Sequence, residues 1–302
     1  MNKKIVCVGA LNVDHILYVD SFAKIDGEEI IKEFLTFSGG QAGNIASGLG
    51  RLGKPAYFFG NIGDDFFTSL LEKDLDEDHV DYSFSKRTSN KNNTVISVVD
   101  KKGERQLYAY NNVELSTADF PDELLDNTYA IVFTSLIKDD IIDTYCEIAK
   151  LAKEKNVMVI LDPGHIFAKK GFDELKPLLS YCDYIFPNEN ELELILGNKE
   201  IDDLLEIVPN IIATRGEKGT RFFSAEKKSK DYMLDQKDFG DVIDTTGAGD
   251  CFLAAFISAF MDYNDEEKAI KYALIASKIS ITRKGARTMP SKEEIEVIFN
   301  EK

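Results

Sequence analysis

The segment DTTGAGD at residues 244–250 has the residue types of an anion site placed beside a base. Gly247, Ala248 and Gly249 stand at the start of a predicted helix, where unpaired N–H groups and the helix dipole favour a bound anion. Asp250 follows within the same first turn. A carboxylate repels a resting anion, but it becomes useful when it accepts a proton from a hydroxyl that attacks a phosphoryl group. From this segment alone, an aspartate that merely stabilises the helix start is the simpler explanation.

Two stretches near the N-terminus have the residue types of a ligand-binding surface. Asn12 and Asp14 follow a short β-branched strand predicted for residues 4–9, and ligands of open α/β sheets sit beyond the carboxyl ends of strands. They can bind substrate hydroxyls or simply form a turn. The segment GGQAGN at residues 39–44 brings the backbone close to a ligand through its paired glycines. Asn44 can reach that ligand or cap the helix that begins there.

Two later clusters also fall at predicted strand ends. Asn188 and Glu191 stand at the start of a predicted helix. Carboxylates opposite a phosphate can hold Mg²⁺ through water, although the same position suits the helix dipole without any ligand. Thr214, Gly216 and Gly219 form a tight turn that permits close approach to a phosphate or an adenine, and turn chemistry alone explains it about as well.

The order of predicted elements indicates an α/β fold. After residue 115, strand and helix patterns alternate, with strands at 130–133, 157–161, 184–186 and 210–213 and helices at 140–153, 172–179 and 189–196. Such alternation implies parallel strands joined by right-handed crossovers, and therefore a doubly wound, mostly parallel sheet flanked by helices. Further elements complete the prediction: an antiparallel edge at 222–224 and 231–234, and closing helices at 247–260, 266–281 and 291–299.

The first third of the chain predicts a second, smaller sheet. Residues at about 14–37 and 94–110 alternate between apolar and polar types, and a hairpin turn is predicted at 100–103. The remaining patterns are a helix that ends near Gly53, a strand at 55–61 and a helix at 64–75 capped by residues 63–65. We expect one domain over residues 1–302, with the small sheet inserted into it.

Composition excludes several classes of partner. The 302 residues carry 36 Lys and Arg against 53 Asp and Glu, a net charge of −17, so nucleic acid and anionic membranes are poor partners. No apolar run is long enough for a signal peptide or a membrane helix. The cysteines Cys7, Cys146, Cys182 and Cys251 form no CxxC pair, which favours reduced thiols in a cytoplasmic protein over disulfides or a zinc site.

Some familiar motifs are absent or misleading. There is no G-x-x-x-x-G-K-[ST] P-loop and no G-x-S-x-G nucleophile elbow. Residues 48–53 match G-x-G-x-x-G, but they continue a predicted helix instead of following a strand, so they are not read as a dinucleotide site. His15, His79 and His165 lack metal-ligand spacing, which leaves acid–base chemistry to a carboxylate.

Taken together, the motifs resemble those of the ribokinase or PfkB-type carbohydrate and nucleoside kinases. The segment 39–44 resembles the N-terminal signature of that family, and 244–250 resembles the C-terminal one. Residues 188–191 are similar to its N-x-x-E motif, 214–219 to its nucleotide loop, and 282–286 to the segment that completes a potassium site. The five motifs occur in the family's order and span nearly the whole chain.

The resemblance implies a ribokinase-like fold and a role for each matching residue. Asp250 would be the general base, and the N–H groups of Gly247, Ala248 and Gly249 would form the anion hole for the γ-phosphoryl group of ATP. Substrate hydroxyls would be bound by Asn12, Asp14, Gly39, Gly40, Gln41 and Asn44. Asn188 and Glu191 would support Mg²⁺ and phosphate, with Glu191 acting through water, and the ATP site would be lined by Thr214, Gly216 and Gly219. A monovalent cation such as K⁺ would be held by the carbonyl groups of Asp244, Thr246, Ser280, Arg283 and Gly285. The small sheet would be a lid, which in many members also forms a dimer contact.

The acceptor of the phosphoryl group is less well defined. The family signature often has Lys where this chain has Gln41, and an uncharged amide suits a neutral polyol at least as well as a phosphosugar. This difference weakens the case for ribose in particular, and a small sugar is the preferred acceptor. A sugar phosphate stays open through the basic residues Lys24, Arg87 and Arg105.

A nucleoside is the main alternative acceptor. Its base would need an apolar cover, for which the candidates are Phe34, Phe37, Tyr108 and Tyr110, and these side chains could equally form the buried face of the lid. A non-catalytic ligand-binding regulator on the same fold is the other alternative. It would be expected to lack the base or the anion hole, and both are intact here.

Overall fold

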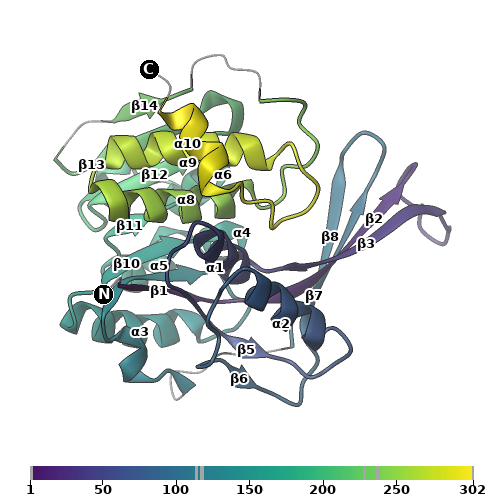
Figure 1. Cartoon of the computed structure of the whole chain (residues 1–302), viewed down its shortest axis with the longest axis horizontal. Coiled ribbons are helices and arrows are strands. Elements are labelled where there is room, and N and C mark those ends of the chain that lie inside the picture. The colour runs from purple at the N-terminus through teal and green to yellow at the C-terminus, as the bar shows by residue number, and fades with distance from the viewer. Residues whose placement is uncertain (1–2, 113–114, 116–118, 227–228, 235–238, 301–302) are drawn as a thin grey trace.

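The computed structural model describes residues 3–112, 115, 119–226, 229–234 and 239–300. Within these residues eight strands form a central sheet (Figure 1). From one edge to the other, the strands are β14 (Lys230–Tyr232), β13 (Thr220–Ser224), β12 (Asn210–Thr214), β11 (Tyr184–Ile185), β10 (Met158–Asp162), β9 (Thr128–Thr134), β1 (Lys4–Val8) and β4 (Ala56–Phe59). All neighbours from β12 to β4 pair in parallel, and only β13 and β14 are antiparallel within this sheet. The predicted doubly wound, mostly parallel sheet is confirmed.

The sheet is covered on both faces because buried side chains alternate along its strands. Ile5 and Cys7 of β1 face a core shared with helices α1 (Gln41–Arg51), α8 (Ala248–Tyr263) and α9 (Glu266–Ser280). Val6 and Val8 face a second core with helices α3 (Ile141–Glu154), α5 (Gly171–Leu179) and α6 (Glu189–Leu196). Helix α10 (Lys292–Phe299) lies against α9 through the ring of Phe299 on Tyr272. Among the described residues, no helix has the length and apolar character needed to span a membrane.

The chain reverses its direction of winding next to β1. From β1 it passes to β4 on one side, and it later returns to β9 on the other side of β1. Crevices at such reversals, beyond the carboxyl ends of the strands, are where α/β sheets bind ligands. The residues that follow β1, β9, β10, β11 and β12 therefore share one edge of the molecule.

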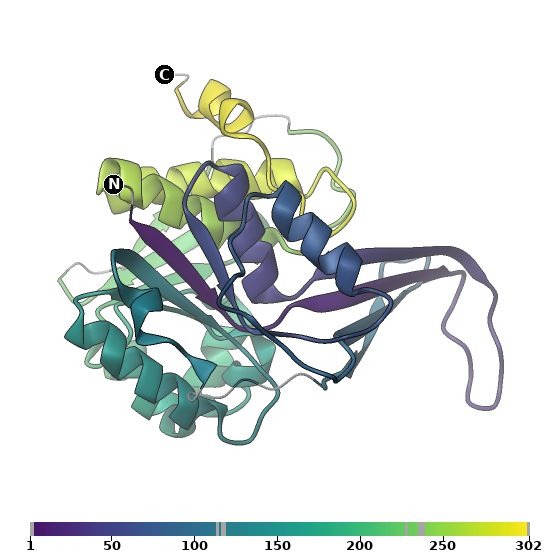
Figure 2. The ribbon, with the colours of Figure 1, turned by 60° about the horizontal axis from the view of Figure 1, so that its bottom comes forward.

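A second sheet projects from this edge of the body (Figures 1 and 2). Its order is β3 (Ile31–Gly39), β2 (Asn12–Val19), β7 (Asn93–Val99) and β8 (Arg105–Tyr110). The four segments join one sheet, as predicted, with β2 and β7 parallel and the other pairs antiparallel. We call these strands the small sheet. Its hairpin turn closes through the Asp100 carboxylate, which accepts from the Lys102 N–H at 2.8 Å.

The predicted start of the helix after residue 63 is wrong. Helix α2 spans Thr68–Glu77, with Phe67 as the residue before its first turn. The Asp65 carboxylate instead accepts from the N–H groups of Phe67 at 2.8 Å and Asn92 at 2.9 Å. These bonds hold residues 63–67 in a turn against the segment before β7, so the helix begins later.

Several short elements were not predicted because they are too brief to show a helical or strand period. They are α4 (Gly164–Ala168), α7 (Ile201–Leu205), the 3₁₀ turns η2 (Asp122–Leu125) and η3 (Gly216–Lys218), and the strand pair β5 (Asn61–Ile62) and β6 (Lys86–Arg87). Residues 48–53 lie in and just after α1, in agreement with the rejection of a dinucleotide motif there.

Candidate active site

Two adjoining cavities occupy the crevice at the carboxyl ends of the strands. The larger, of about 300 Å³, is lined by Gln41, Asp162, Phe186, Asn188, Glu191, Thr214, Thr245, Gly247, Ala248, Gly249, Asp250 and Phe252. The smaller, of about 110 Å³, lies under the small sheet and is lined by Asn12, Gln41, Asn93, Tyr110, Ser135, Ile137, Ile166 and their neighbours. Gln41 lines both, so the cavities meet at the start of α1.

The larger cavity contains the N-terminus of α8, as the sequence predicts. Gly247 caps this helix with φ 74°, and a Cβ there would lie 2.1 Å from the Ala286 carbonyl oxygen, so both conformation and space require glycine. A Cβ on Gly249 would meet open space. The Ala248 N–H donates to the Thr245 carbonyl at 3.3 Å. This bond is long and therefore weak, so a bound anion could replace it.

Asp250 is buried in the first turn of α8 and is held by Asn44 from the first turn of α1. The Asn44 Nδ2 donates to Asp250 Oδ2 at 2.8 Å, and both residues are 8% exposed. Burial raises the pKa of Asp250 to about 7, and the Asn44 hydrogen bond opposes that rise. The nearby carboxylates of Asp14 and Glu191 raise this pKa further, while the Arg287 guanidinium lowers it. A carboxyl group with a pKa near neutrality can accept a proton efficiently at physiological pH.

The predicted acceptor side holds two buried oxygens that lack partners. Asn12 Oδ1 and Asp14 Oδ1 have no hydrogen-bond partner among the described residues. Gly39 is required beside them, since its Cβ would lie 2.0 Å from Asp14 Oδ2, and Gly40 has φ 89° before α1. Burial raises the pKa of Asp14 to about 6, against the charge of Arg287. Unpaired buried acceptors favour a ligand that donates hydrogen bonds.

Gln41 is fixed by a polar chain that crosses the crevice. The Ser135 hydroxyl donates to Gln41 Oε1 at 2.8 Å, and Gln41 Nε2 donates to Asp162 Oδ1 at 3.2 Å. Burial, together with the charges of Asp250 and Glu191, raises the pKa of Asp162 well above its ordinary value. Asp162 was not predicted as a site residue, although its place at the end of β10 is the same signal that singled out Asn12 at the end of β1.

Asn188 and Glu191 form a complete capping box on α6. The Asn188 Oδ1 accepts from the Glu191 N–H, and Glu191 Oε2 accepts from the Asn188 N–H, both at 2.9 Å. Both residues also line the larger cavity, and burial raises the pKa of Glu191. The two residues therefore cap the helix, as a position at a helix start suggests. The Asn188 amide nitrogen and one Glu191 oxygen take no part in the capping box.

The predicted nucleotide loop is only partly gathered at the cavity. Thr214 ends β12, where its N–H donates to the Pro187 carbonyl at 3.0 Å, and it lines the larger cavity. Gly216 and Gly219 lie in the following turn, outside the lining of that cavity. The glycine at 219 is needed for the turn, because its φ is 77° and a Cβ would lie 2.1 Å from the Tyr232 carbonyl.

The segments predicted to hold a monovalent cation lie against each other. Asp244 Oδ2 accepts from the Gly285 N–H at 3.1 Å, and its Oδ1 accepts from the Thr246 N–H at 2.9 Å. The Asp244 N–H donates to the Ile281 carbonyl, one residue beyond Ser280. The Arg283 N–H donates to the Ser280 carbonyl at 3.2 Å, which turns this part of the chain back toward Asp244.

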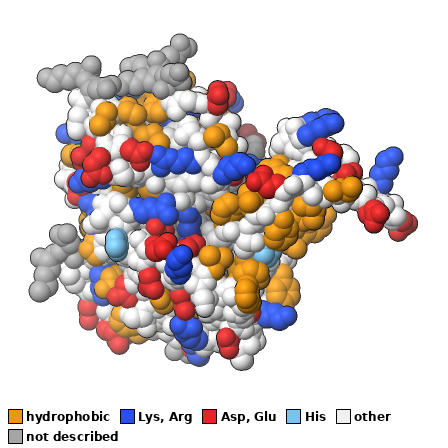
Figure 3. All heavy atoms as spheres, turned by 45° about the vertical axis from the view of Figure 1, so that its right-hand side comes forward, with side chains coloured by type: hydrophobic (Ala, Val, Ile, Leu, Met, Phe, Trp, Pro, Cys, Tyr) orange, Lys and Arg blue, Asp and Glu red, His pale blue; other side chains and the backbone are white. Residues whose placement is uncertain are grey.

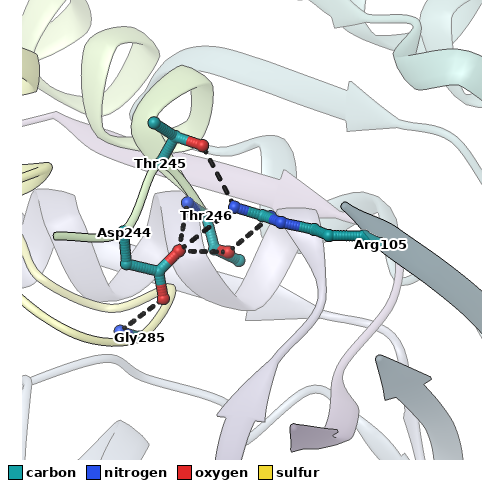
Figure 4. Close-up of polar contacts among 5 residues, drawn as sticks. All are labelled: Arg105, Asp244, Thr245, Thr246 and Gly285. Carbon is teal, nitrogen blue, oxygen red and sulfur yellow. Dashed lines mark hydrogen bonds and ion pairs between the residues drawn. The ribbon is translucent and has the colours of Figure 1, made fainter. Parts of the chain in front are cut away.

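Arg105 reaches this region from the small sheet (Figure 4). Its guanidinium donates to the hydroxyls of Thr246 at 2.9 Å and Thr245 at 3.1 Å, and it lies 3.5 Å from Asp244 Oδ1. From the sequence, Arg105 is only one of three basic residues that keep a sugar phosphate possible as the acceptor. Arg87, which was grouped with it, instead pairs with Glu72 at the surface of the body.

Two of the aromatic candidates for covering a base lie on the wrong face of the small sheet. Strand register places Asp14 with Val95 and Ala109 on the face toward the crevice, whereas Phe34 and Tyr108 lie on the opposite face. Tyr110 shares the face of Tyr108, but it is the last residue of β8 and lines the smaller cavity. Phe37 lies beside Gly285. The prediction that Phe34 and Tyr108 cover a base is therefore wrong for this arrangement, because side chains alternate faces along a strand.

Comparisons with known proteins agree with this geometry. Residues 2–293 match the model of the "pfkB family carbohydrate kinase". The chain is 28% identical over 301 residues to an ATP-dependent ribose-1-phosphate kinase from Halopiger xanaduensis, with 99% of each protein covered. Its structure is similar to that of the ribokinase from Thermotoga maritima, with a TM-score of 0.87, 27% identity and complete coverage of both chains. It is also similar to the nucleoside kinase from Methanocaldococcus jannaschii, with a TM-score of 0.85, 25% identity and 99% of each chain covered. The family model covers nearly the whole chain, and this protein therefore belongs to the pfkB family of carbohydrate kinases.

Proposed function

We propose that this enzyme transfers the γ-phosphoryl group of ATP to a hydroxyl of a small sugar, with Asp250 as the general base. The observation that carries the proposal is the position of Asp250, which lines the larger cavity together with the N-terminus of α8 and lies close enough to Asp14 for that carboxylate to raise its pKa. In the proposed complex, a sugar hydroxyl bound by the unpaired oxygens of Asn12 and Asp14 would lie next to Asp250 and face the γ-phosphoryl group. Family membership supports ATP as the donor.

In the proposed reaction, the acceptor hydroxyl attacks the γ-phosphorus as its proton passes to Asp250. The bond from phosphorus to the bridging oxygen of ADP breaks, and negative charge grows on the transferring oxygens. The N–H groups of Gly247, Ala248 and Gly249 stabilise this charge. Removing one preorganised donor of this kind typically costs about 3 kcal/mol of transition-state stabilisation.

The acidic residues of the larger cavity fit a hydrated Mg²⁺. Glu191, with its free oxygen, lies close enough to Asp162 and Asp250 for their charges to influence each other, and oxygen ligands are those that Mg²⁺ prefers. Glu191 would hold the ion through water, and Asn188 would use its free amide nitrogen on a phosphate oxygen. Bound Mg²⁺ would neutralise charge on the phosphates. Thr214 would line the ATP site at the end of β12, and Gly216 and Gly219 would shape the loop beyond it.

The family resemblance implies that carbonyl oxygens of the neighbouring loops hold a monovalent cation such as K⁺. We infer that Asp244, Thr246, Ser280, Arg283 and Gly285 supply them. The Asp244 carboxylate ties the two segments together through Thr246 and Gly285. Addition of K⁺ would then raise activity by ordering the segment before the anion hole.

The acceptor proposal favours a sugar over a nucleoside. Hydroxyl donors match the unpaired oxygens of Asn12 and Asp14, and Asn12 lines the smaller cavity together with Gln41. Asn44, Gly39 and Gly40 would complete the acceptor site, as the family resemblance implies. The smaller cavity measures about 110 Å³, which leaves little room for a base beside a sugar ring. A nucleoside is the second candidate, since Leu136, Ile137 and Ile166 give that cavity an apolar wall.

An ADP-release screen tests the proposal directly. Pentoses, hexoses, ketoses, sugar phosphates and nucleosides would be offered with ATP and Mg²⁺, with and without K⁺. We expect acceptor-dependent ADP release with a neutral sugar. Preference for nucleosides would favour the second candidate, and the absence of acceptor-dependent release with every compound would favour a non-catalytic binding protein.

The small sheet would act as a lid, and its outer face would form a dimer contact. Phe34, Ile96 and Tyr108 on that face are 55%, 38% and 58% exposed, and hydrophobic side chains gather over the small sheet (Figure 3). We expect Tyr108→Lys to lower the sedimentation coefficient relative to the unchanged protein. If the variant and the unchanged protein both sediment as monomers, the dimer proposal fails.

The free thiols of all four cysteines agree with a cytoplasmic setting.

A further inference from the structure

Arg287 is a half-buried cation that the proposed reaction does not yet use. It follows the Gly285-Ala286 turn, and its side chain enters the space between α1 and the end of β3. Its Nε donates to Asn44 Oδ1 at 3.2 Å, and its Nη2 donates to the Gly39 carbonyl at 3.3 Å. No local pattern points to this role, because residues 39–44 and 287 are brought together only by the tertiary fold.

The Arg287 contact fixes which way the Asn44 amide points. A guanidinium has only donors, so the atom of Asn44 that faces it must be the oxygen. The amide nitrogen is then turned toward Asp250 Oδ2, to which it donates at 2.8 Å. One carboxylate oxygen of Asp250 is thereby occupied by a donor, and the other is left to take a proton.

The glycine-rich segment makes room for this arginine. A Cβ on Gly43 would lie 2.7 Å from Arg287 Nη2 and 2.7 Å from a methyl carbon of Leu11. A gap that small cannot be relieved by the guanidinium without loss of its bonds to Asn44 and Gly39. The segment at 39–44 therefore seats Arg287 as well as lining the acceptor side.

Charge favours the same arrangement. Arg287 lies close enough to Asp14 and Asp250 to lower the pKa of both carboxyl groups, against the effect of their burial. The other groups that face Asp250 are Asn44, Asp14 and Glu191, with Asp162 influenced by it across the cavity. The positive charge of Arg287 therefore opposes the rise in pKa that burial causes at both carboxyl groups, although the pKa of Asp14 is still raised to about 6 and that of Asp250 to about 7.

We propose that Arg287 is a positioning residue that orients the general base through Asn44. The inference rests on the proposed role of Asp250. Arg287 touches neither the acceptor nor the phosphates in this role. It sets the direction of one hydrogen bond and supplies charge to the acceptor side.

A double-mutant cycle tests this route. We expect Arg287→Gln to lower kcat by about tenfold, the size typical of losing an outer-shell partner, with little change in the KM for ATP. In an Asn44→Ala background the same substitution should lower kcat by less than about twofold, because its route to Asp250 is already lost. Equal factors in the two backgrounds would overturn the proposal.

The pH dependence gives a second readout that a purely structural role would not move. Loss of the positive charge should shift the acid limb of kcat/KM to higher pH in Arg287→Gln, and Arg287→Lys should keep the limb near its original position while kcat still falls. If Arg287→Gln does not fold, the same cycle with Arg287→Lys decides the matter. An unmoved acid limb in a folded Arg287→Gln protein would contradict the charge contribution.

Arg51 provides a matched control. It donates to the Arg287 carbonyl and pairs with Asp78, but it is bonded to neither Asn44 nor Gly39. Arg51→Gln removes an equal charge nearby and should leave kcat within about twofold. Calorimetric titration with ADP verifies that each variant is folded. The parent proposal is tested separately: if Asp250→Asn is inactive while Arg287→Gln keeps the original kcat and acid limb, only the positioning role fails.

Discussion

Strand β8 reaches the segment that leads into helix α8, yet the two elements differ sharply in burial. In α8, every residue from Asp250 to Phe260 is buried. In β8, all six residues from Arg105 to Tyr110 are exposed. Burial in a close-packed core fixes a side chain without help from a ligand, whereas exposed segments owe their position to a few polar contacts. The proposed phosphoryl-transfer side is therefore fixed by the core, whereas the proposed acceptor side would depend on the position of the small sheet.

The small sheet packs on the body through Val13 and the His15 ring of β2. Polar contacts tie its two edge strands, β3 and β8, to residues around the proposed anion hole. Arg105 binds the residues before the anion hole, and Glu33 of β3 lies 3.3 Å from the Lys284 ammonium. Each contact includes exposed side chains, which water and salt weaken. The comparison predicts that changes in the buried half act on the chemical step, and that changes in the exposed half act on closure over the acceptor.

The largest effect is expected from Asp250→Asn, which removes the base but keeps the shape of the side chain. We expect kcat to fall by about 10²–10⁴-fold, the usual contribution of a general base. Binding of ADP, measured by calorimetry, should change little, because the backbone N–H groups are untouched. Near-original turnover in this variant would contradict the assignment of Asp250.

The next largest effect is expected from Gly247→Ala, which attacks the backbone of the anion hole. The new Cβ would lie 2.1 Å from the Ala286 carbonyl oxygen, so the segment must shift. The N–H groups of residues 247–249 would then no longer point at the transferring phosphoryl group. We expect kcat to fall by about 10²-fold, near the cost of one lost donor.

Gly53→Ala is the matched control for this substitution. It places alanine at a similar φ of 73°, with nothing within 4 Å of the Cβ. It should reduce stability by about 1–2 kcal/mol and leave kcat unchanged. Equal losses of kcat in the two variants would show that strain alone, and not the anion hole, explains the Gly247 effect.

The buried half also predicts a pH dependence. Because burial raises the pKa of Asp250 to about 7, the base becomes protonated as the pH falls through that value. We expect kcat/KM to drop by about tenfold between pH 8 and pH 6. Protonation of Asp250 would not lower kcat/KM by unfolding the protein. The pKa of Asp250 is higher in the folded than in the unfolded protein, so its protonation adds stability as the pH falls from 7 toward 4. A flat profile across this range would contradict the buried base.

Sequence reasoning predicted the elements and helix starts whose signals lie in consecutive residues. The glycines and aspartate at 247–250, the capping pair at Asn188 and Glu191, and the alternation of strands and helices are all local signals. Arg287 was missed because its partner Asn44 is far away in the chain. Asp162 was missed although its place at a strand end is a local signal, and only its bond to Gln41 required the fold. The facing of Phe34 and Tyr108 was also missed, because it depends on the register of β3 and β8 against β2 and β7. Local pattern predicts elements and motifs, while the polar connections between them require the fold.

The smallest of these effects, and the one that isolates the exposed half, is expected from Arg105→Ala. The variant removes the guanidinium from Thr245, Thr246 and Asp244 but leaves the core intact. We expect kcat/KM for the acceptor to fall by about tenfold, as for loss of charge-assisted hydrogen bonds, with the KM for ATP nearly unchanged. Arg105→Lys should recover part of the loss.

Closure can be observed directly because the sequence contains no tryptophan. Leu107, which is 66% exposed on the crevice face of β8, can be changed to tryptophan as a unique fluorescent reporter. Acceptor should change the emission of Leu107→Trp, and the added Arg105→Ala should reduce that change. Glu33→Gln is the matched control, since it breaks another polar contact of the small sheet, the one with Lys284, without touching residues 244–246. If both substitutions reduce the emission change and kcat/KM equally, the contact of Arg105 is no different from other surface contacts of the small sheet. The proposed specific connection between the small sheet and the anion hole is then wrong.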